Sequence, residues 1–323
     1  MTNLGIRVLS ESCITHVIHI GDIHVRIGNQ QHSRAQEYAT VFSSFLEKIH
    51  LLPCVRDGRC LLVIAGDVFH NKGRLETEGA TVFFRWINQI LEVVPILVIC
   101  GNHDFRQEDP TYCDMIEMFT TPYSAPGRHP IHYLRDTGLY RWGNIGFGVV
   151  SVKDTLRAFN TRGMVDDLPP FPLFPAAADG GGPELVRRVA IFHGSISQSA
   201  LPNGRLMPTE HGYPLEWFRG YDIAMLGDNH KQQLHKDALD GTLQWGYPGS
   251  LIQQDIGEPT FGHGFILWNL AKNRGKLFHV PNDYGSFTMR QDGAGGWRVR
   301  FGLRDTQPLE TVSYTHLTLP TKA

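Results

Sequence analysis

The sequence predicts a layered α/β fold, because short apolar runs alternate with longer helical patterns along the first part of the chain. Three continuous apolar runs, each followed by glycine, have the composition of parallel strands buried on both faces: HVIHI (16–20), LLVIA (61–65) and PILVIC (95–100). Helical patterns follow them over residues 33–50, 75–93 and 111–119. Strand–helix alternation of this kind implies right-handed crossovers, with helices packed against a sheet.

The second half of the chain predicts further strands at residues 145–150, 186–192, 221–226 and 243–247. Residues 166–183 are rich in Pro, Gly and Ala and predict an irregular surface insertion. After residue 270, short alternating runs such as WRVRFGL (297–303) indicate the beginning of a small β-rich unit. We therefore predict a main domain over residues 1–270 and the start of a capping β unit over residues 271–311.

The last residues, VSYTHLTLPTKA (312–323), do not continue this alternation. They resemble translated sequencing-adapter read-through, so we expect a non-native tail and a native chain cut short near Thr311. An ordinary disordered tail is the alternative.

Composition narrows the class of protein. With 41% hydrophobic residues, a net charge of −2 and a pI near 6.8, the chain is globular and has no global basic field for nucleic acid. A local cleft or bound cations could still supply positive charge. Five cysteines without a CxxC pair argue against a disulfide framework and a thiolate zinc site. The polar N-terminal residues and the absence of long apolar stretches predict a soluble intracellular protein, in the cytoplasm or nucleus of its source or host cell.

Polar side chains that can ligate metal ions follow five of the predicted strands. In chain order they are Asp22 and His24, Asp67, Asn102 with His103 and Asp104, His193, and Asp228 with His230. In open α/β sheets, functional groups collect beyond the carboxyl ends of the strands. Carboxylate, imidazole and carboxamide groups together suit Mn²⁺, Fe²⁺, Zn²⁺ or Mg²⁺. The pattern therefore predicts a metal site at this edge.

Each of these elements has a simpler interpretation when it is taken alone. A Gly-Asp pair after a strand is usually a turn, and isolated histidines are usually structural. We interpret the remaining unpartnered histidines in that way: His16, His19, His50, His129, His132 and His211. The order of five loops, DxH, GD, GNHD, H and DxH, favours one metal centre over a set of unrelated turns.

These residues resemble the calcineurin-like metallophosphoesterase superfamily. Its DNA-repair nuclease branch, which includes bacterial SbcD and the meiotic-recombination nuclease, is similar in GDIH, GDVFHNKGR, GNHDFRQ and FHG. The later stretch YPGSLIQQDIGEPTFGHGFILWNL is similar to homologues carried by large DNA viruses. The resemblance covers roughly residues 14–270. It implies a four-layer α-β-β-α sandwich with a dinuclear metal site at the carboxyl ends of the strands.

The resemblance also implies a role for each position. The expected ligands are Asp22, His24 and His230 for the first metal ion, Asp67 as a bridge, and Asn102, His193 and Asp228 for the second. His103 matches the family's proton donor to the leaving oxygen, and Asp104 is expected to orient its ring.

Residue 228 departs from the family pattern. The last loop usually reads GHxH, whereas this chain reads Gly-Asp-Asn-His, so that Asp228 stands where a histidine ligand is expected. We predict that Asp228 is a substituted ligand, because a carboxylate can bind a hard metal ion. The alternative is that it points away and accepts a hydrogen bond from His193 or His230.

The implied activity is metal-dependent hydrolysis of DNA phosphodiesters, as an exonuclease and endonuclease at DNA ends in DNA repair. A water activated by two divalent metal ions would attack phosphorus, and His103 would protonate the departing 3′ oxygen. Mn²⁺ is the expected ion, with Mg²⁺, Fe²⁺ and Zn²⁺ as alternatives. The relatives imply a homodimer and an SMC-like coiled-coil ATPase as partner.

Three other functions are alternatives to the nuclease. A phosphodiesterase or phosphatase of the same fold acting on a nucleotide or another small phosphoester shares the metal site and is the main alternative. A protein phosphatase would carry GDxxDRG and GNHE, which this chain lacks. A non-catalytic scaffold would have no need of His103.

Overall fold

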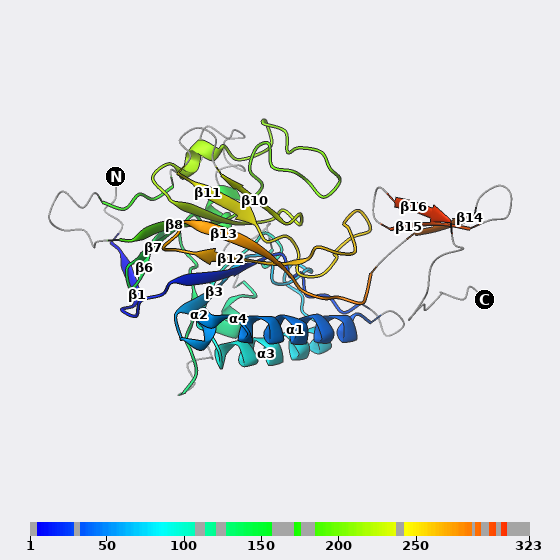
Figure 1. The fold of residues 1–323 in the computed structure, drawn as a ribbon, viewed down its shortest axis with the longest axis horizontal. Coiled ribbons are helices and arrows are strands. Elements are labelled where there is room, and N and C mark those ends of the chain that lie inside the picture. The colour runs from blue at the N-terminus through cyan, green and yellow to red at the C-terminus, as the bar shows by residue number, and fades with distance from the viewer. Residues whose placement is uncertain are drawn as a thin grey trace.

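The computed structural model describes residues 5–28, 33–106, 114–120, 127–156, 171–175, 185–236, 242–285, 288–291, 297–301 and 305–308. Two large β-sheets and a smaller third sheet account for its strands, with helices along one side (Figure 1). The α/β class predicted from the strand–helix alternation is confirmed.

A six-stranded sheet contains the three strands that the first apolar runs predict. Across the sheet the order is β13 (Arg274–His279), β12 (Gly264–Asn269), β2 (His16–Ile20), β3 (Cys60–Ala65), β4 (Ile96–Ile99) and β5 (Ile131–Tyr133). Strands β2 to β5 run parallel, whereas β12 pairs antiparallel with both β2 and β13. The carboxyl ends of the parallel strands therefore share one edge.

A seven-stranded sheet contains the four later predicted strands. Its order is β1 (Arg7–Ser10), β6 (Gly138–Trp142), β7 (Ile145–Val149), β8 (Arg187–His193), β9 (Ile223–Gly227), β11 (Gln244–Tyr247) and β10 (Gln233–Lys236). Strands β7, β8, β9 and β11 are parallel, β6 is antiparallel to β7 but parallel to β1, and β10 is antiparallel to β11. The loops after β8 and β9 therefore leave the sheet together.

An apolar core lies on each face of the six-stranded sheet, one towards the seven-stranded sheet and the other towards the helices. Alternate residues of one strand point to opposite faces, so that Val63 of β3 packs towards the seven-stranded sheet and Ile64 towards the helices. Both residues are fully buried. This burial on both faces explains why the strand sequence is apolar at every position.

Helices α1 and α3 cover the free face of the six-stranded sheet and lie side by side (Figure 1). The first four helices of the described chain are α1 (Ala35–His50), α2 (Pro53–Arg56), α3 (Thr77–Leu91) and α4 (Glu117–Thr120), and residues 152–156 are helical as well. Phe42 of α1 stacks on Trp86 of α3, with ring centroids 4.0 Å apart. Of the helix expected over residues 111–119, the described part forms only α4, and residues 107–113 lie outside the described residues.

The free face of the seven-stranded sheet carries a third core, which includes Phe192 and Tyr221. Among the described residues this face is covered by irregular chain and the 3₁₀ helix η3 (Leu215–Phe218). Most of the insertion expected at 166–183 lies outside the described residues, but Phe171 and Phe174 are described and buried in this core.

A small antiparallel sheet follows the two large ones. It consists of β14 (Thr288–Gln291), β15 (Trp297–Phe301) and β16 (Asp305–Pro308). The six-stranded sheet itself continues through β13, past residue 270, where the sequence places the domain boundary. The expected tail over residues 312–323 lies outside the described residues. No helix in the described part of the chain is both long and apolar enough to span a membrane.

Candidate metal centre

The residues of the predicted metal site come from loops at the carboxyl ends of strands in both large sheets. The loops after β2, β3 and β4 deliver Asp22, His24, Asp67, Asn102 and His103, and β8 and β9 lead to His193, Asp228 and His230. A direct contact joins the two sets, because the backbone N–H of Asp228 donates to both carboxylate oxygens of Asp22, at 2.9 and 3.1 Å. The site therefore lies on the seam between the sheets.

The same unusual backbone conformation recurs at three of these strand ends. Asp22, His24, Asp67 and Asp228 have φ of +50°, +46°, +51° and +88°. For a residue other than glycine, this left-handed conformation costs about 1–2 kcal/mol. Such strain is concentrated at functional sites, where the surrounding structure maintains it. The repeated Gly-Asp sequences thus correspond to a repeated strained turn.

The glycines next to these residues allow the loops to approach closely. A Cβ atom on Gly101 would lie 2.1 Å from Asp67 Oδ1, and one on Gly66 would lie 2.5 Å from His193 Nδ1. No side-chain carbon fits at such distances. The glycines at positions 66 and 101 are therefore required by the packing of the polar loops.

Asp22, His24 and His230 form a first group of convergent donor atoms, all within 4.8 Å of one another. The Nε2 atoms of His24 and His230 lie 3.0 Å apart. Asp22 is fully buried and His24 is 3% exposed. These are the residues expected to hold the first metal ion.

Asp22, Asp67 and His193 form a second group with the same spacing. Asp67 stands between the two groups. Its Oδ2 lies 3.4 Å from His24 Nε2, and its Oδ1 lies 3.4 Å from His193 Nε2. One carboxylate with an oxygen towards each group has the geometry expected of a bridging ligand.

The side chain of Asn102 supports a cation in the second group. Its Oδ1 faces His193 Nε2 at 3.2 Å and the two carboxylate oxygens of Asp67 at 3.1 and 3.2 Å. All of these atoms can act as acceptors, so their convergence is explained either by an amide turned to present its NH₂ group or by a shared cation. Carboxamide oxygen, carboxylate and imidazole together suit a divalent ion.

Three histidines are fixed in the tautomer that a metal ligand or acid needs. The Nδ1–H of His193 donates to the Ala65 carbonyl at 2.8 Å, and that of His103 to the His70 carbonyl at 2.7 Å. His230 Nδ1 contacts the carboxylate of Glu258 at 2.6 Å. An oxygen partner on one ring nitrogen leaves the other nitrogen free for a metal ion or substrate.

Without bound cations, the buried carboxylates and histidines of this centre shift the pKa values of one another. Burial raises the pKa of Asp22 to about 7, although His230 and His193 oppose the rise. Burial acts on Asp67 in the same direction, but His193 and His24 outweigh it and hold the pKa of Asp67 below its usual range. Metal ions bind the deprotonated forms of such ligands and would take the place of these protons.

Asp228 lies at the rim of the second group. Its Oδ1 is 3.8 Å from His193 Nε2, which is too far for a hydrogen bond. Its Oδ2 accepts a 2.6 Å hydrogen bond from the Ser195 hydroxyl, and the side chain is 31% exposed. The carboxylate therefore has a partner that neither of the two expectations from sequence included.

If Asp228 is a ligand, Asp228→His should keep two metal ions, increase activity with Zn²⁺ relative to Mn²⁺ and lower the pH optimum. The reason is that a neutral imidazole replaces an anion: it favours Zn²⁺, and the less compensated cations acidify a bound water. Metal content and pH–rate profiles measure these effects, and Ser195→Ala controls for loss of the hydrogen bond alone. An unchanged metal preference and profile would remove Asp228 from the ligand set.

The structure corrects the role expected for Asp104. This residue does not orient the His103 ring, because the His70 carbonyl holds that ring. The buried carboxylate of Asp104 instead accepts hydrogen bonds from the backbone N–H groups of Phe69 and Gly101, at 2.9 and 2.8 Å. It joins the loops after β3 and β4, and burial raises its pKa well above the usual value.

His70 is a residue of this centre that sequence reasoning left without a role. Its ring stacks on His103 with centroids 5.5 Å apart and meets His24 edge-on at 5.4 Å. The three histidines form a third group of convergent nitrogens. His70 is the last residue of the GDVFH motif, but the sequence alone does not show that this loop contacts the GNHD loop.

Glu258 is a second residue that sequence reasoning missed. It is 1% exposed, and its Oε1 lies 2.6 Å from His230 Nδ1. Its Oε2 accepts hydrogen bonds from the Ser250 hydroxyl at 2.8 Å and the Gln254 N–H at 2.9 Å. Burial lowers the pKa of His230, but Glu258 and Asp22 outweigh it and raise that pKa to about 9. Glu258 thus fixes the ring of a predicted ligand.

Glu258→Gln should weaken metal binding by roughly 10–100-fold, the usual scale for a partner that orients a ligand. If the amide oxygen keeps the two hydrogen bonds that Oε2 now accepts, its NH₂ group faces His230 Nδ1 and cannot accept a proton from it, so the His230 ring loses the partner that fixes its tautomer. Titration calorimetry with Mn²⁺ measures the change. Asp255→Asn, at an exposed position of the same loop, is the control and should bind metal as the wild type does.

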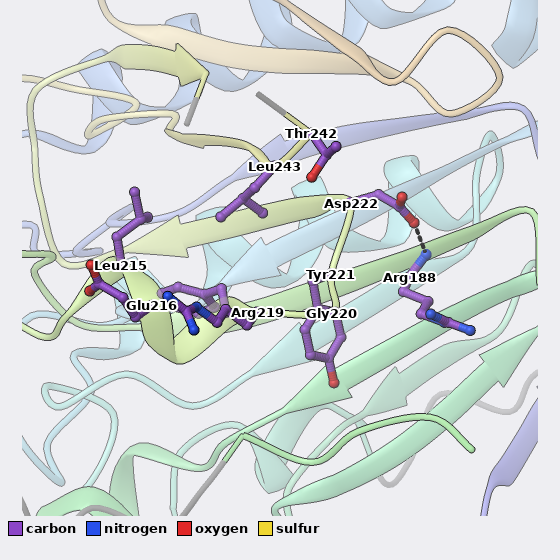
Figure 2. A pocket seen from close by; sticks show the side chains of 10 residues that line it. Arg188, Leu215, Glu216, Arg219, Gly220, Tyr221, Asp222, Thr242 and Leu243 are labelled. Atoms are coloured by element: carbon purple, nitrogen blue, oxygen red, sulfur yellow. Dashed lines mark hydrogen bonds between the residues drawn. The ribbon is translucent and has the colours of Figure 1, made fainter. Parts of the chain in front are cut away.

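A cavity of about 640 Å³ lies away from these residues, on the side of η3 (Figure 2). Its lining includes Arg188 and Asp222, and the Asp222 carboxylate accepts the Arg188 backbone N–H at 2.8 Å. None of the lining residues belongs to the convergent donor groups. The cavity is therefore separate from the metal centre.

Two stacked sheets with adjoining donor groups at their carboxyl edge form a candidate site for two metal ions. Residues 15–232 match the calcineurin-like phosphoesterase family, and the chain belongs to that family. Hydrolysis of phosphoester bonds is the activity that the family's description names. The resemblance drawn from the motifs is confirmed at the level of the superfamily.

Two viral proteins are similar in sequence. The uncharacterized protein R555 of Acanthamoeba polyphaga mimivirus is 29% identical over 299 residues, which cover 90% of this chain and 20% of R555. This chain thus spans about a fifth of the length of that relative. Protein 244L of Invertebrate iridescent virus 6, whose name describes a phosphoesterase, is 22% identical over 243 residues. These residues cover 75% of this chain and 72% of 244L.

A solved structure, GAP50, the anchor in the inner membrane complex of Plasmodium, aligns with a TM-score of 0.42 and 9% identity. The alignment covers 84% of this chain and 90% of that one.

Proposed function

We propose that this phosphoesterase is a DNA nuclease that hydrolyses phosphodiesters at DNA ends, as exonuclease and endonuclease. The observation that carries the proposal is the placement of His103 beside both donor groups. Its backbone N–H donates to Asp67 Oδ1 at 2.8 Å, and its ring meets the His24 ring at 4.8 Å. A DNA phosphodiester leaves a sugar alkoxide, which needs such an acid. The nuclease-type motifs GDVFHNKGR and GNHDFRQ support the same reading.

Most residues of the centre would hold the cations, whereas His103 would transfer a proton. Asp22, His24 and His230 would hold one divalent ion, Asn102 and His193 the other, and Asp67 both. When bound, the ions supply a water of lowered pKa and offset the charge on the phosphate. His103 donates its Nδ1–H to the His70 carbonyl, so it would need a second proton on Nε2, and this proton would go to the departing 3′ oxygen.

A second candidate shares the same centre. A phosphodiesterase or phosphatase acting on a nucleotide or another small phosphoester needs the same cations and the same acid. The net charge of −2 favours this candidate, because a protein without a basic field does not concentrate a polyanion around itself.

Substrate comparison with Mn²⁺ present tests the proposal. We expect nicking of supercoiled plasmid and degradation of linear duplex DNA, together with turnover of bis-p-nitrophenyl phosphate. Turnover of small esters without any DNA cleavage would support the second candidate. Failure on every substrate would indicate a scaffold. The Asp67→Asn variant, purified in parallel, controls for a contaminating nuclease.

Further proposals rest on the resemblance to the DNA-repair nucleases. We propose Mn²⁺ as the metal, action on DNA inside the cell, a homodimer, and an SMC-like coiled-coil ATPase as partner. Light scattering of the purified protein tests the dimer, and metal analysis of protein isolated without added metal tests the ion.

A further inference from the structure

Arg26 is a half-buried arginine whose contacts are all with neutral groups. Its Nη1 lies 3.2 Å from His70 Nε2, and its Nη2 donates to the Gln254 carbonyl. Among the described residues, no carboxylate lies within ion-pair distance of this guanidinium. Its positive charge is therefore not cancelled by a contact within the protein.

The charged groups near Arg26 are already engaged. Arg34 donates to the Glu37 carboxylate at 2.7 Å. Glu258 is held by His230 and by two further donors, and Asp255 accepts the backbone N–H of Gly257 at 2.5 Å. A guanidinium has five N–H donors, of which two are used here, so three remain for a ligand. Such a fork of donors matches the oxygens of a phosphate group.

Arg26 is one imidazole ring away from the proposed reaction site. The His70 ring that it contacts stacks on His103, the proposed acid, and meets His24 of the first donor group edge-on. Consecutive contacts thus form the row His103, His70, Arg26, and the proposed acid His103 marks the leaving-group side of this row. A nucleic acid bound with its scissile phosphate at the cations would carry its next phosphate along this row.

We propose that Arg26 forms a subsite for the phosphate that neighbours the scissile phosphodiester on the leaving-group side. The ligand class is a polynucleotide with at least two consecutive phosphates. This inference rests on the proposed nuclease function and deepens it, because a phosphoesterase for isolated phosphoesters has no use for a second phosphate site. The carbonyl of Gln254 keeps Arg26 in place and belongs to the loop that carries Glu258.

Three thymidine dinucleotides separate a phosphate subsite from a role through His70. TpT has only the scissile phosphate, pTpT carries an added phosphate on the nucleoside that leaves with the 3′ oxygen, and TpTp carries it on the other side. We expect the wild type to prefer pTpT. Arg26→Met keeps the aliphatic stem and should lower kcat/KM for pTpT by about 10–100-fold, the loss expected for hydrogen bonds to a charged group. The loss for TpT and TpTp should be at least tenfold smaller.

Two further measurements complete the test. In Arg26→Met, the KM for a 20-nucleotide strand should rise less steeply with salt concentration. The slope should fall by the amount that corresponds to about one phosphate contact. Arg59→Met is the matched control, because Arg59 precedes β3 at the opposite edge of the sheet and pairs with Asp57. It should behave as the wild type on all substrates.

The outcomes are distinct. Equal losses on all three dinucleotides would make Arg26 a positioning residue for His70 and overturn the subsite. A loss confined to TpTp would place the neighbouring phosphate on the wrong side and overturn it as well, as would no loss at all. Failure of the wild type to cleave plasmid DNA would instead refute the proposed nuclease function.

Discussion

Asp67→Ala is expected to abolish hydrolysis of both plasmid DNA and bis-p-nitrophenyl phosphate, while the fold is retained. The carboxylate stands between the two donor groups, with one oxygen 3.4 Å from His24 Nε2 and the other 3.4 Å from His193 Nε2. Its removal deprives both groups of a shared anion, the carboxylate that lies 3.4 Å from both His24 and His193. Asp67 also accepts the His103 N–H, so the acid loses its anchor in the same variant.

The fold should survive because Asp67 lies in the loop after β3, at the carboxyl edge of the sheet, so that its truncation removes no apolar contact between the sheets. His230→Ala, in the loop after β9, should give the same result. Turnover, metal content and thermal unfolding are the measurements, with Asp57→Ala at an exposed position as control. Wild-type turnover in either variant with metal present would refute the assignment of the centre.

His103→Ala is expected to slow DNA hydrolysis by at least about 100-fold, the usual scale of general-acid help, without loss of metal ions. The contact of residue 103 with Asp67 is made by the backbone N–H and survives the substitution. Bis-p-nitrophenyl phosphate provides an internal control. Its leaving group departs without a proton, so the loss of rate on this substrate should be much smaller than on DNA.

Elemental analysis of His103→Ala decides the alternative. His103 belongs to a group of convergent nitrogens with His24 and His70. The alternative to an acid is therefore that His103 ligates a metal ion. Loss of one equivalent of metal, with equal losses of rate on both substrates, would place His103 among the ligands.

The strands that the sequence predicted are those buried on both faces. The run LLVIA became β3, whose residues are all buried, because a strand between two cores has no position that tolerates a polar side chain. Two strands it did not predict, β1 (RVLS) and β10 (QLHK), lie at the edges of the seven-stranded sheet and are partly exposed. Their mixed composition satisfies edge packing but carries no period that marks a strand.

The candidate site, like the set of strands, could be predicted only in part from the sequence. The residues after strands were predictable because the topology alone brings the carboxyl ends of parallel strands together. The partners of those residues were not. Asp104 follows His103 directly but contacts Phe69 and Gly101, and Glu258 reaches His230 from a loop that follows β11. Such contacts depend on how loops of unrelated sequence position pack, which no local pattern encodes.

The seam between the sheets has a consequence for the assembly of the protein. Apolar packing is not directional, so two sheets that dock with the wrong offset can still bury most of their core. Such a molecule would bring Asp22 and Asp67 against neither His193 nor His230 and would hold only half a ligand set. Cations that bind the native arrangement alone stabilise it by mass action. Metal supply would then select correctly docked chains from misassembled ones during folding, before any substrate is bound.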